Sequence, residues 1–157
     1  MGHDALSDGL EPISLARVEE SLTRQGYAFL EDASTPDHVR ARFDDYRFTF
    51  LLAGHDHAVL QSRGKWSRLV DVEHKLEMIR MCNEWNMRRI WPKVYVRREG
   101  EGMLAVYGEV AADFGAGAAD AQIDRALRCG LSSVIAFFHG LEERLGAELA
   151  DLDAVDA

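Results

Sequence analysis

The sequence predicts a single α+β domain in which an antiparallel sheet has helices packed on one side. Strand-like alternation of apolar and polar residues recurs in short stretches joined by tight turns, at 39–43, 46–52 and 94–97, which favours hairpins. Apolar residues at helical spacing mark an early, a central and a long final helix. The expected order is α-β-β-β-β-α-β-β-α, without βαβ alternation or an internal repeat.

The size and composition suit one domain with one core. The chain has 157 residues, of which 47% are hydrophobic, enough for a packed interior. We expect a flexible N-terminal arm at 1–12, the domain at 13–149 and an acidic, frayed tail at 150–157. No apolar run reaches the ~18 residues of a membrane span, and the acidic start lacks signal-peptide character, so a cytoplasmic location is expected. The two cysteines, Cys82 and Cys129, are interpreted as reduced, packed thiols.

The first helix is expected at 14–25. Ser14 is a suitable N-cap, and Gly26 suits the position after the helix end. A short strand, Tyr27–Leu30, should leave this helix, and the composition of Asp32–Asp37 is typical of a loop.

A hairpin is the clearest strand signal in the chain. Residues 39–43 and 46–52 alternate on either side of Asp44-Asp45, which is expected to form the turn. Because alternate side chains point to opposite faces, one face should lie on the core and the other should be exposed. The exposed face then carries Arg40, Arg42 and Arg47.

The middle of the chain predicts one more strand and the central helix. The strand is expected at 59–63, with Gly64 and Lys65 leading to Trp66, and the helix from about Asp71 to Arg89. On a helical wheel one apolar arc contains Val72, Leu76, Ile79 and Ile90. Asn83 and Asn86 fall on the same arc. Because a buried amide without partners costs ~1–3 kcal/mol, we interpret both as polar clamps that hold backbone groups, with ligand binding as the alternative.

After Pro92 the pattern changes to that of a strand. Residues 94–97 and 103–112 are expected to pair across the turn 98–102, and Gly108 indicates a bulge or a close backbone approach. The last helix is expected at 120–149. Its apolar stripe consists of Ile123, Leu127, Leu131, Val134, Phe138, Leu141 and Leu145.

The net charge of −9 hides an asymmetry. Between His38 and Arg98 there are 13 Lys+Arg and 7 Asp+Glu, or +6, and the flanks carry the remaining 5 and 20, or −15. A basic sheet surface for an anionic partner, pairing of the ends with the middle, and plain solubility are all compatible with this pattern.

No residue cluster predicts catalysis, a metal site or a cofactor. His55-Asp56-His57 is the closest pair of metal-ligand candidates, but no third ligand stands at a suitable spacing. Gly115-Ala116-Gly117 lacks the lysine and third glycine of a phosphate loop. Trp66, Trp85 and Trp91 gather around the central helix; core filling is the preferred interpretation, and stacking on bases or anchoring of a peptide is the alternative.

The centre of the chain resembles the YbjN family of bacterial sensory transduction regulators. The similarity covers about residues 12–145 and the composition is typical of actinobacteria. It is carried by Cys82-Asn83-Glu84-Trp85-Asn86, Ile90-Trp91-Pro92-Lys93-Val94-Tyr95-Val96, Phe43–Tyr46, Leu52–Gly54, Val106–Val110 and Phe137-Phe138. The resemblance implies a fold like that of type III secretion chaperones, small and often dimeric domains that bind extended segments of partner proteins. Ala118-Ala119 stands where relatives have a threonine N-cap.

The sequence therefore favours a non-enzymatic, cytoplasmic module, expected to act as a homodimer, that binds a protein or peptide on a sheet face or edge. Binding of RNA or DNA by the same basic face is the alternative, with the net charge against it. The candidate partner-binding residues are Arg40, Arg42, Arg47, Trp66, Trp91, Tyr95 and Arg97.

Overall fold

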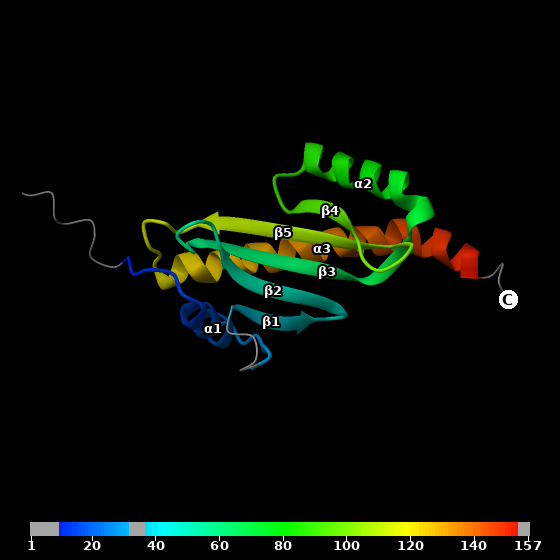
Figure 1. The fold of residues 1–157 in the computed structure, drawn as a ribbon. Helices are drawn as coiled ribbons and strands as arrows, with labels where there is room; N and C mark the ends of the chain where they lie inside the picture. The colour runs from blue at the N-terminus through cyan, green and yellow to red at the C-terminus, as the bar shows by residue number, and fades with distance from the viewer. Residues whose placement is uncertain (1–9, 32–36, 154–157) are drawn as a thin grey trace, which may run out of the picture.

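The computed structural model describes residues 10–31 and 37–153, with backbone only beyond Leu145. Five antiparallel strands form one sheet in the order β1-β2-β3-β5-β4, which confirms the predicted fold class (Figure 1). The elements are α1 (Leu15–Arg24), β1 (His38–Phe43), β2 (Tyr46–Ala53), β3 (Val59–Asp71), the short 3-10 helix η1 (Val72–His74), α2 (Lys75–Arg88), β4 (Lys93–Arg98), β5 (Met103–Asp113) and α3 (Asp120–Asp153).

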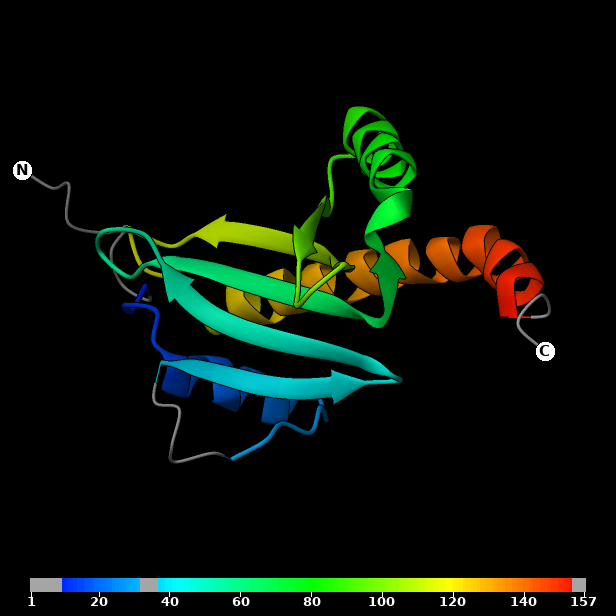
Figure 2. The same cartoon turned by 45° about the vertical axis from the view of Figure 1, so that its right-hand side comes forward.

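The described helices cover one face of the sheet and not the other (Figures 1 and 2). α1 and α3 pack on the same face, and α2 runs beside β4 at the sheet edge (Figures 1 and 2). All seven apolar residues predicted for the last helix are buried on the sheet. We call the opposite side of the sheet the open face, because no described helix lies on it (Figure 2).

The N-terminal predictions largely agree with the structure. The Ser14 side chain accepts a hydrogen bond from the backbone N–H of Arg17, as an N-cap does. The expected strand Tyr27–Leu30 is reduced to one bridge, in which the N–H of Leu30 donates to the carbonyl of Arg40. Within the expected flexible arm, Glu11 is held by a bridge to Ala118. Residues 1–9, most of the 32–37 loop (32–36) and 154–157 of the tail lie outside the described residues.

Both predicted hairpins are present. Phe43 lies opposite Tyr46 around the Asp44-Asp45 turn, and Arg98 lies opposite Leu104 across the second hairpin. The strand predicted to end at 63, however, continues to Asp71, with a register shift between Lys65 and Leu69. The prediction of the strand end was wrong because Gly64 was interpreted as the residue that terminates the strand.

Gly64 instead allows α3 to approach the sheet closely. A Cβ atom at Gly64 would lie 2.6 Å from a methyl carbon of Val134, and one at Gly108, the residue opposite in β5, would lie 3.2 Å from it. A Cβ atom at Gly130 of α3 would likewise lie only 2.7 Å from the Cβ atom of Ser62. Three glycines therefore let the long helix lie directly on β3 and β5, which supplies packing that a side chain would prevent.

The apolar arc predicted for the central helix is wrong. Leu76 and Ile90 are 61% and 86% exposed, and the side chains that α2 buries are Met78, Met81 and Cys82. A helical wheel holds only within one continuous helix. Here the helix begins at Lys75 and ends at Arg88, so the residues that set the predicted phase at either end lie outside it.

Candidate functional site

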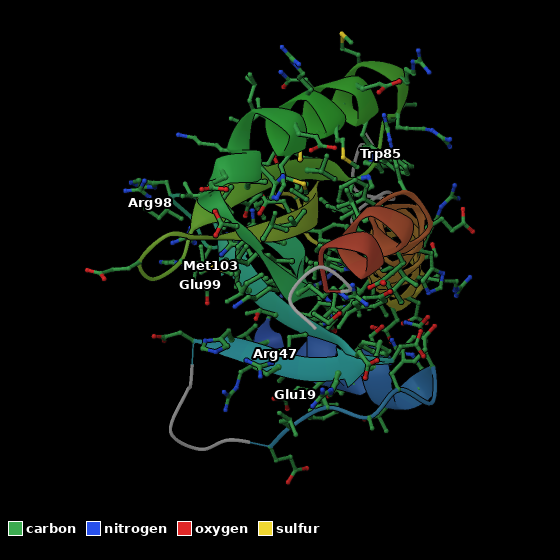
Figure 3. The ribbon with its side chains drawn as sticks, turned by 90° about the vertical axis from the view of Figure 1, so that its right-hand side faces the viewer. Glu19, Arg47, Trp85, Arg98, Glu99 and Met103 are labelled. Carbon is green, nitrogen blue, oxygen red and sulfur yellow. The ribbon has the colours of Figure 1, made fainter. Side chains whose placement is uncertain are left out.

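The open face is ordered in rows, because the strands are in register across the sheet. In one row, Arg42 lies opposite Arg47, Arg47 opposite Lys65, Lys65 opposite Tyr107, and Tyr107 opposite Tyr95. The adjacent row contains Arg40, Thr49, Arg63, Glu109 and Lys93. Basic side chains from β1 to β4 thus occupy one continuous surface, and Figure 3 shows Arg47 and Glu99 on it, away from α3.

Glu109 is the hub of this surface. Its carboxylate is 5% exposed although it lies on the face that no helix covers. One oxygen accepts from Gln61 at 2.9 Å and pairs with Lys93 at 2.6 Å. The other accepts from Arg63 at 3.0 Å and from the Tyr95 hydroxyl at 2.9 Å. Four neighbouring side chains therefore cover and satisfy the buried charge.

The hub holds its carboxylate ionised. Burial acts to raise the pKa of Glu109, but the hydrogen bonds from Lys93, Tyr95 and Arg63 outweigh it and keep the pKa below its ordinary value. Burial and the bond to Glu109 raise the pKa of Tyr95 to about 12. At neutral pH the hub is a carboxylate with a protonated tyrosine, an arrangement that positions the cations around it.

Two tyrosines and a second ion pair complete the β4 side of the face. The rings of Tyr95 and Tyr107 stack with their centroids 5.5 Å apart, and the Arg97 guanidinium lies 5.7 Å from the centroid of Tyr107. Lys65 pairs with Glu99 at 2.5 Å, and this bond lowers the pKa of Glu99. Aromatic and charged groups are thus preorganised beside the hub.

Basic residues outnumber acidic ones on this face. Its basic residues are Arg40, Arg42, Arg47, Arg63, Lys65, Lys93 and Arg97, and the carboxylates on the same side of the sheet are Asp71, Glu99, Glu109 and Asp113; seven minus four gives +3. Arg42 and Arg47 are exposed and lie directly opposite each other, an arrangement of like charges that destabilises a sheet. Neither forms an ion pair with the described residues.

The structure brings together five of the seven predicted partner-binding residues. Arg40, Arg42, Arg47, Tyr95 and Arg97 all lie on the open face. The other two, Trp66 and Trp91, lie elsewhere.

The structure corrects the prediction that Trp66 is a partner-binding residue. Trp66 is 1% exposed on the helix-covered face, where its indole N–H donates to Glu142 of α3 at 2.9 Å, so it fills the core and cannot contact a partner. Trp91, 52% exposed, precedes β4 and lines a hollow beside α3. The alternation of β3 places Lys65 and Trp66 on opposite faces, and the prediction that the strand ended at 63 concealed this.

The two asparagines have different surroundings. The Asn86 amide donates to the carbonyl of Val94 at 2.9 Å and accepts from the N–H of the same residue at 3.0 Å. It therefore binds the outer edge of β4 as a neighbouring strand would. Asn83 is exposed and lines a shallow depression with Lys93 and Glu109, without joining this clamp.

Sequence reasoning missed the hub because its members are distant along the chain. Gln61 and Arg63 lie in β3, Lys93 and Tyr95 in β4, and Glu109 in β5. The period-2 alternation of β5 was a usable signal, since it places Glu109 on the same side as Tyr107. The partners of a carboxylate depend on strand order, which one sequence does not reveal.

The part of the chain that the structure describes has neither a cluster of metal ligands nor a membrane-spanning helix. No group of three or more His, Cys, Asp or Glu side chains is arranged there to hold a metal ion. None of the described helices has the length and apolar character needed to cross a membrane. Cys82 is buried, and burial raises the pKa of its thiol to about 11.

These features define an α+β domain whose ordered surface is a charged, uncovered sheet face. The chain belongs to the YbjN family, because the family model described as "Putative bacterial sensory transduction regulator" matches residues 14–143. The family description names a regulator and no enzyme. No curated protein matches the sequence.

Two solved structures have a similar fold. The crystal structure of YbjN from E. coli, described as a putative transcription regulator, superposes with a TM-score of 0.74 at 11% identity, covering 87% of this chain and 96% of that one. An uncharacterized protein from Methanothermobacter thermautotrophicus superposes with a TM-score of 0.52 at 11% identity, covering 84% and 99%. At these identities the likeness concerns the fold alone.

Proposed function

We propose that this domain is a non-enzymatic regulatory module that binds an acidic segment of a partner protein on its open face. The observation that carries the proposal is the row in which Arg42, Arg47 and Lys65 lie opposite one another on adjacent strands. Like charges in that arrangement cost stability. An anionic partner offsets this cost by supplying the missing carboxylates.

The buried hub supports the same proposal. Glu109 neutralises part of the charge of Arg63 and Lys93 and fixes their side chains, while Arg42 and Arg47 have no such partner among the described residues. A partner that reaches across the face therefore meets ordered cations near β4 and then Arg42 and Arg47, which have no ion pair among the described residues. Preorganised charges of this kind favour fast and selective encounter with an acidic surface.

Affinity capture of the tagged protein from its own cytoplasm tests the proposal. The test variant is Arg42→Glu with Arg47→Glu, and the matched control is Arg80→Glu with Arg88→Glu, which changes the net charge equally on exposed positions of α2. We expect the test variant to recover about fivefold to tenfold less of a specific protein than the control, the effect of two surface charges. Equal recovery by the two variants would remove the open face as the binding surface.

Nucleic-acid binding is a second candidate, favoured by the stacked Tyr95 and Tyr107 between Lys65, Lys93 and Arg97. Aromatic rings beside cations can stack bases. The net charge of −9 disfavours it. Nuclease treatment of half of each capture sample decides between the two: loss of the captured material, with binding that weakens steeply as salt rises, supports nucleic acid.

The homodimer and the cytoplasmic location expected from the sequence are part of this proposal. Sedimentation velocity of the purified protein checks the first. Fractionation of cells that express the tagged chain checks the second.

A further inference from the structure

The sheet has a stretch of strand edge at β5 that no described strand covers. β4 pairs with β5 only from Leu104 to Glu109, whereas β5 continues to Asp113. Figure 1 shows β5 extending past the end of β4. Residues 110–113 thus have β3 on one side and no described strand on the other.

The direction of the free hydrogen-bonding groups follows from two contacts. The N–H and C=O of Val94 bind Asn86 and so point away from β5. Its opposite residue, Gly108, must therefore point its own groups at β3. The N–H of Phe114 donates to Ala58, next to β3, at 2.9 Å, which fits the same alternation. The main-chain groups of Ala111 and Asp113 consequently point outward from the sheet.

At two other places on the sheet edge, side-chain or main-chain groups of the chain itself bind outward main-chain groups. Asn86 occupies both outward groups of Val94 on β4, and the N–H of Leu30 occupies the outward carbonyl of Arg40 on β1. An uncapped edge is a template for pairing with another chain. The end of β5 combines outward main-chain groups at Ala111 and Asp113 with a hollow beside them, so a further strand fits there.

A hollow beside this edge has the chemistry of an apolar but positively charged groove. Its volume is about 650 Å³, and its lining includes the small residues Ala111, Ala112, Ala126, Cys129 and Ser132, with Trp91 and Phe114. The charged residues in the lining are Arg125 and Arg128, both exposed, and no described carboxylate lines it. Neither arginine forms an ion pair with the described residues.

We propose that this edge and hollow bind one extended segment of a partner protein, in which apolar and acidic residues alternate, by strand addition to β5. A residue paired with Ala111 points its side chain onto the open face, towards Lys93, and its two neighbours point theirs into the hollow. The apolar side chains at these two neighbouring positions fill the space left by the small residues, and the acidic side chain between them lies towards Lys93. Arg125 and Arg128 add positive potential beside the segment. The inference rests on the proposed function only in taking a protein segment as the partner.

Binding of a synthetic peptide tests the inference without knowledge of the natural partner. The probe is a fluorescently labelled heptapeptide of alternating Val and Asp, with the Val and Lys repeat as its control, measured by anisotropy on the purified chain. Ala111→Pro removes the outward N–H and no hydrogen bond to β3, and Ala111→Val is the matched variant that keeps the N–H. A Val and Asp peptide N-methylated at its central residues supplies a second test that leaves the protein unchanged.

We expect the wild type and Ala111→Val to bind the Val and Asp peptide, with about fivefold to tenfold weaker binding by Ala111→Pro and by the N-methylated peptide, since each loses main-chain hydrogen bonds. Binding should also slow modification of Cys129, which lines the hollow. Absence of binding to the wild type, or equal binding by the proline variant and the wild type, overturns the inference.

Two further outcomes separate this inference from the proposed function. Loss of peptide binding in Arg42→Glu with Arg47→Glu, but not in Ala111→Pro, places the peptide on the open face, which overturns strand addition and supports the proposed function. A wild-type dimer that dissociates in Ala111→Pro, without peptide binding, assigns the edge to a second copy of the chain and also overturns the inference. Peptide binding that only Ala111→Pro weakens supports strand addition, even where partner capture by the open face fails.

Discussion

The two faces of the sheet are built from the same strands but have opposite chemistry. The face under α1 and α3 holds the largest fully buried side chains, Trp66, Phe48 and Phe50, together with glycines that admit α3 to close contact. The open face holds ion pairs around Glu109 and the facing pair Arg42 and Arg47, neither of which forms an ion pair with the described residues. Because side chains alternate along each strand, substitutions at neighbouring positions should act on stability at one position and on binding at the next.

The largest effect is expected where the helix-covered face leaves no space. Gly64→Ala places a methyl group 2.6 Å from Val134 and 3.0 Å from the ring of Phe48, and should lower the free energy of unfolding by about 3 kcal/mol. Gly140→Ala on α3, whose added methyl group meets nothing within 4 Å, should raise it by about 0.5–1 kcal/mol. Urea unfolding measures both.

A double variant sharpens this prediction. Adding Val134→Ala to Gly64→Ala removes the atom that the new methyl group meets. The loss of unfolding free energy in the double variant should therefore be smaller than the sum of the losses in the two single variants. Simple additivity would mean that the close contact does not limit packing.

The next effect concerns the Glu109 hub of the open face. Glu109→Gln removes the charge that Lys93 and Arg63 share and should cost about 2 kcal/mol at neutral pH. The folded pKa of Glu109 is lowered, so its contribution is complete above the ordinary glutamate pKa of about 4.3 and is lost as the pH falls through the folded value. The difference between variant and wild type should shrink accordingly in unfolding curves measured from pH 7 downward; a constant difference would contradict the charge-based account.

Substitution of Asn86 tests how much its hydrogen bonds to the edge strand β4 contribute to stability. Asn86→Ala removes two hydrogen bonds to Val94 and should cost about 1 kcal/mol, since β4 is still paired with β5. Asn83→Ala, three residues earlier and without these bonds, should change the thermal midpoint little. Similar losses in the two variants would show that helix α2, rather than the clamp, is what the substitutions disturb.

The smallest effect should have the opposite sign. Arg42→Glu places a carboxylate opposite Arg47 and should raise the free energy of unfolding by about 0.5 kcal/mol at low salt, less as salt screens the pair. The same variant should recover less partner protein in affinity capture. A gain in stability with unchanged capture would leave the arginine row without a binding role.

Much of the fold followed from local pattern. Ser14 and Gly26 bounded the first helix, the alternation around Asp44-Asp45 identified the first hairpin with its arginine face, and the stripe from Ile123 to Leu145 identified the buried side of α3. These succeeded because caps, tight turns and amphipathic periods act between residues close in sequence.

The sequence by itself determined the class of fold, the family resemblance and the identity of the exposed arginines. The tertiary structure alone decided that Gly64 lies within a strand under Val134, that Trp66 belongs to the core, and that residues of three strands meet at Glu109. It also decided where β4 ends along β5, and hence which main-chain groups are free. The physical reason is that close approach, burial and edge exposure depend on which distant segments become neighbours, and strand order sets those neighbours.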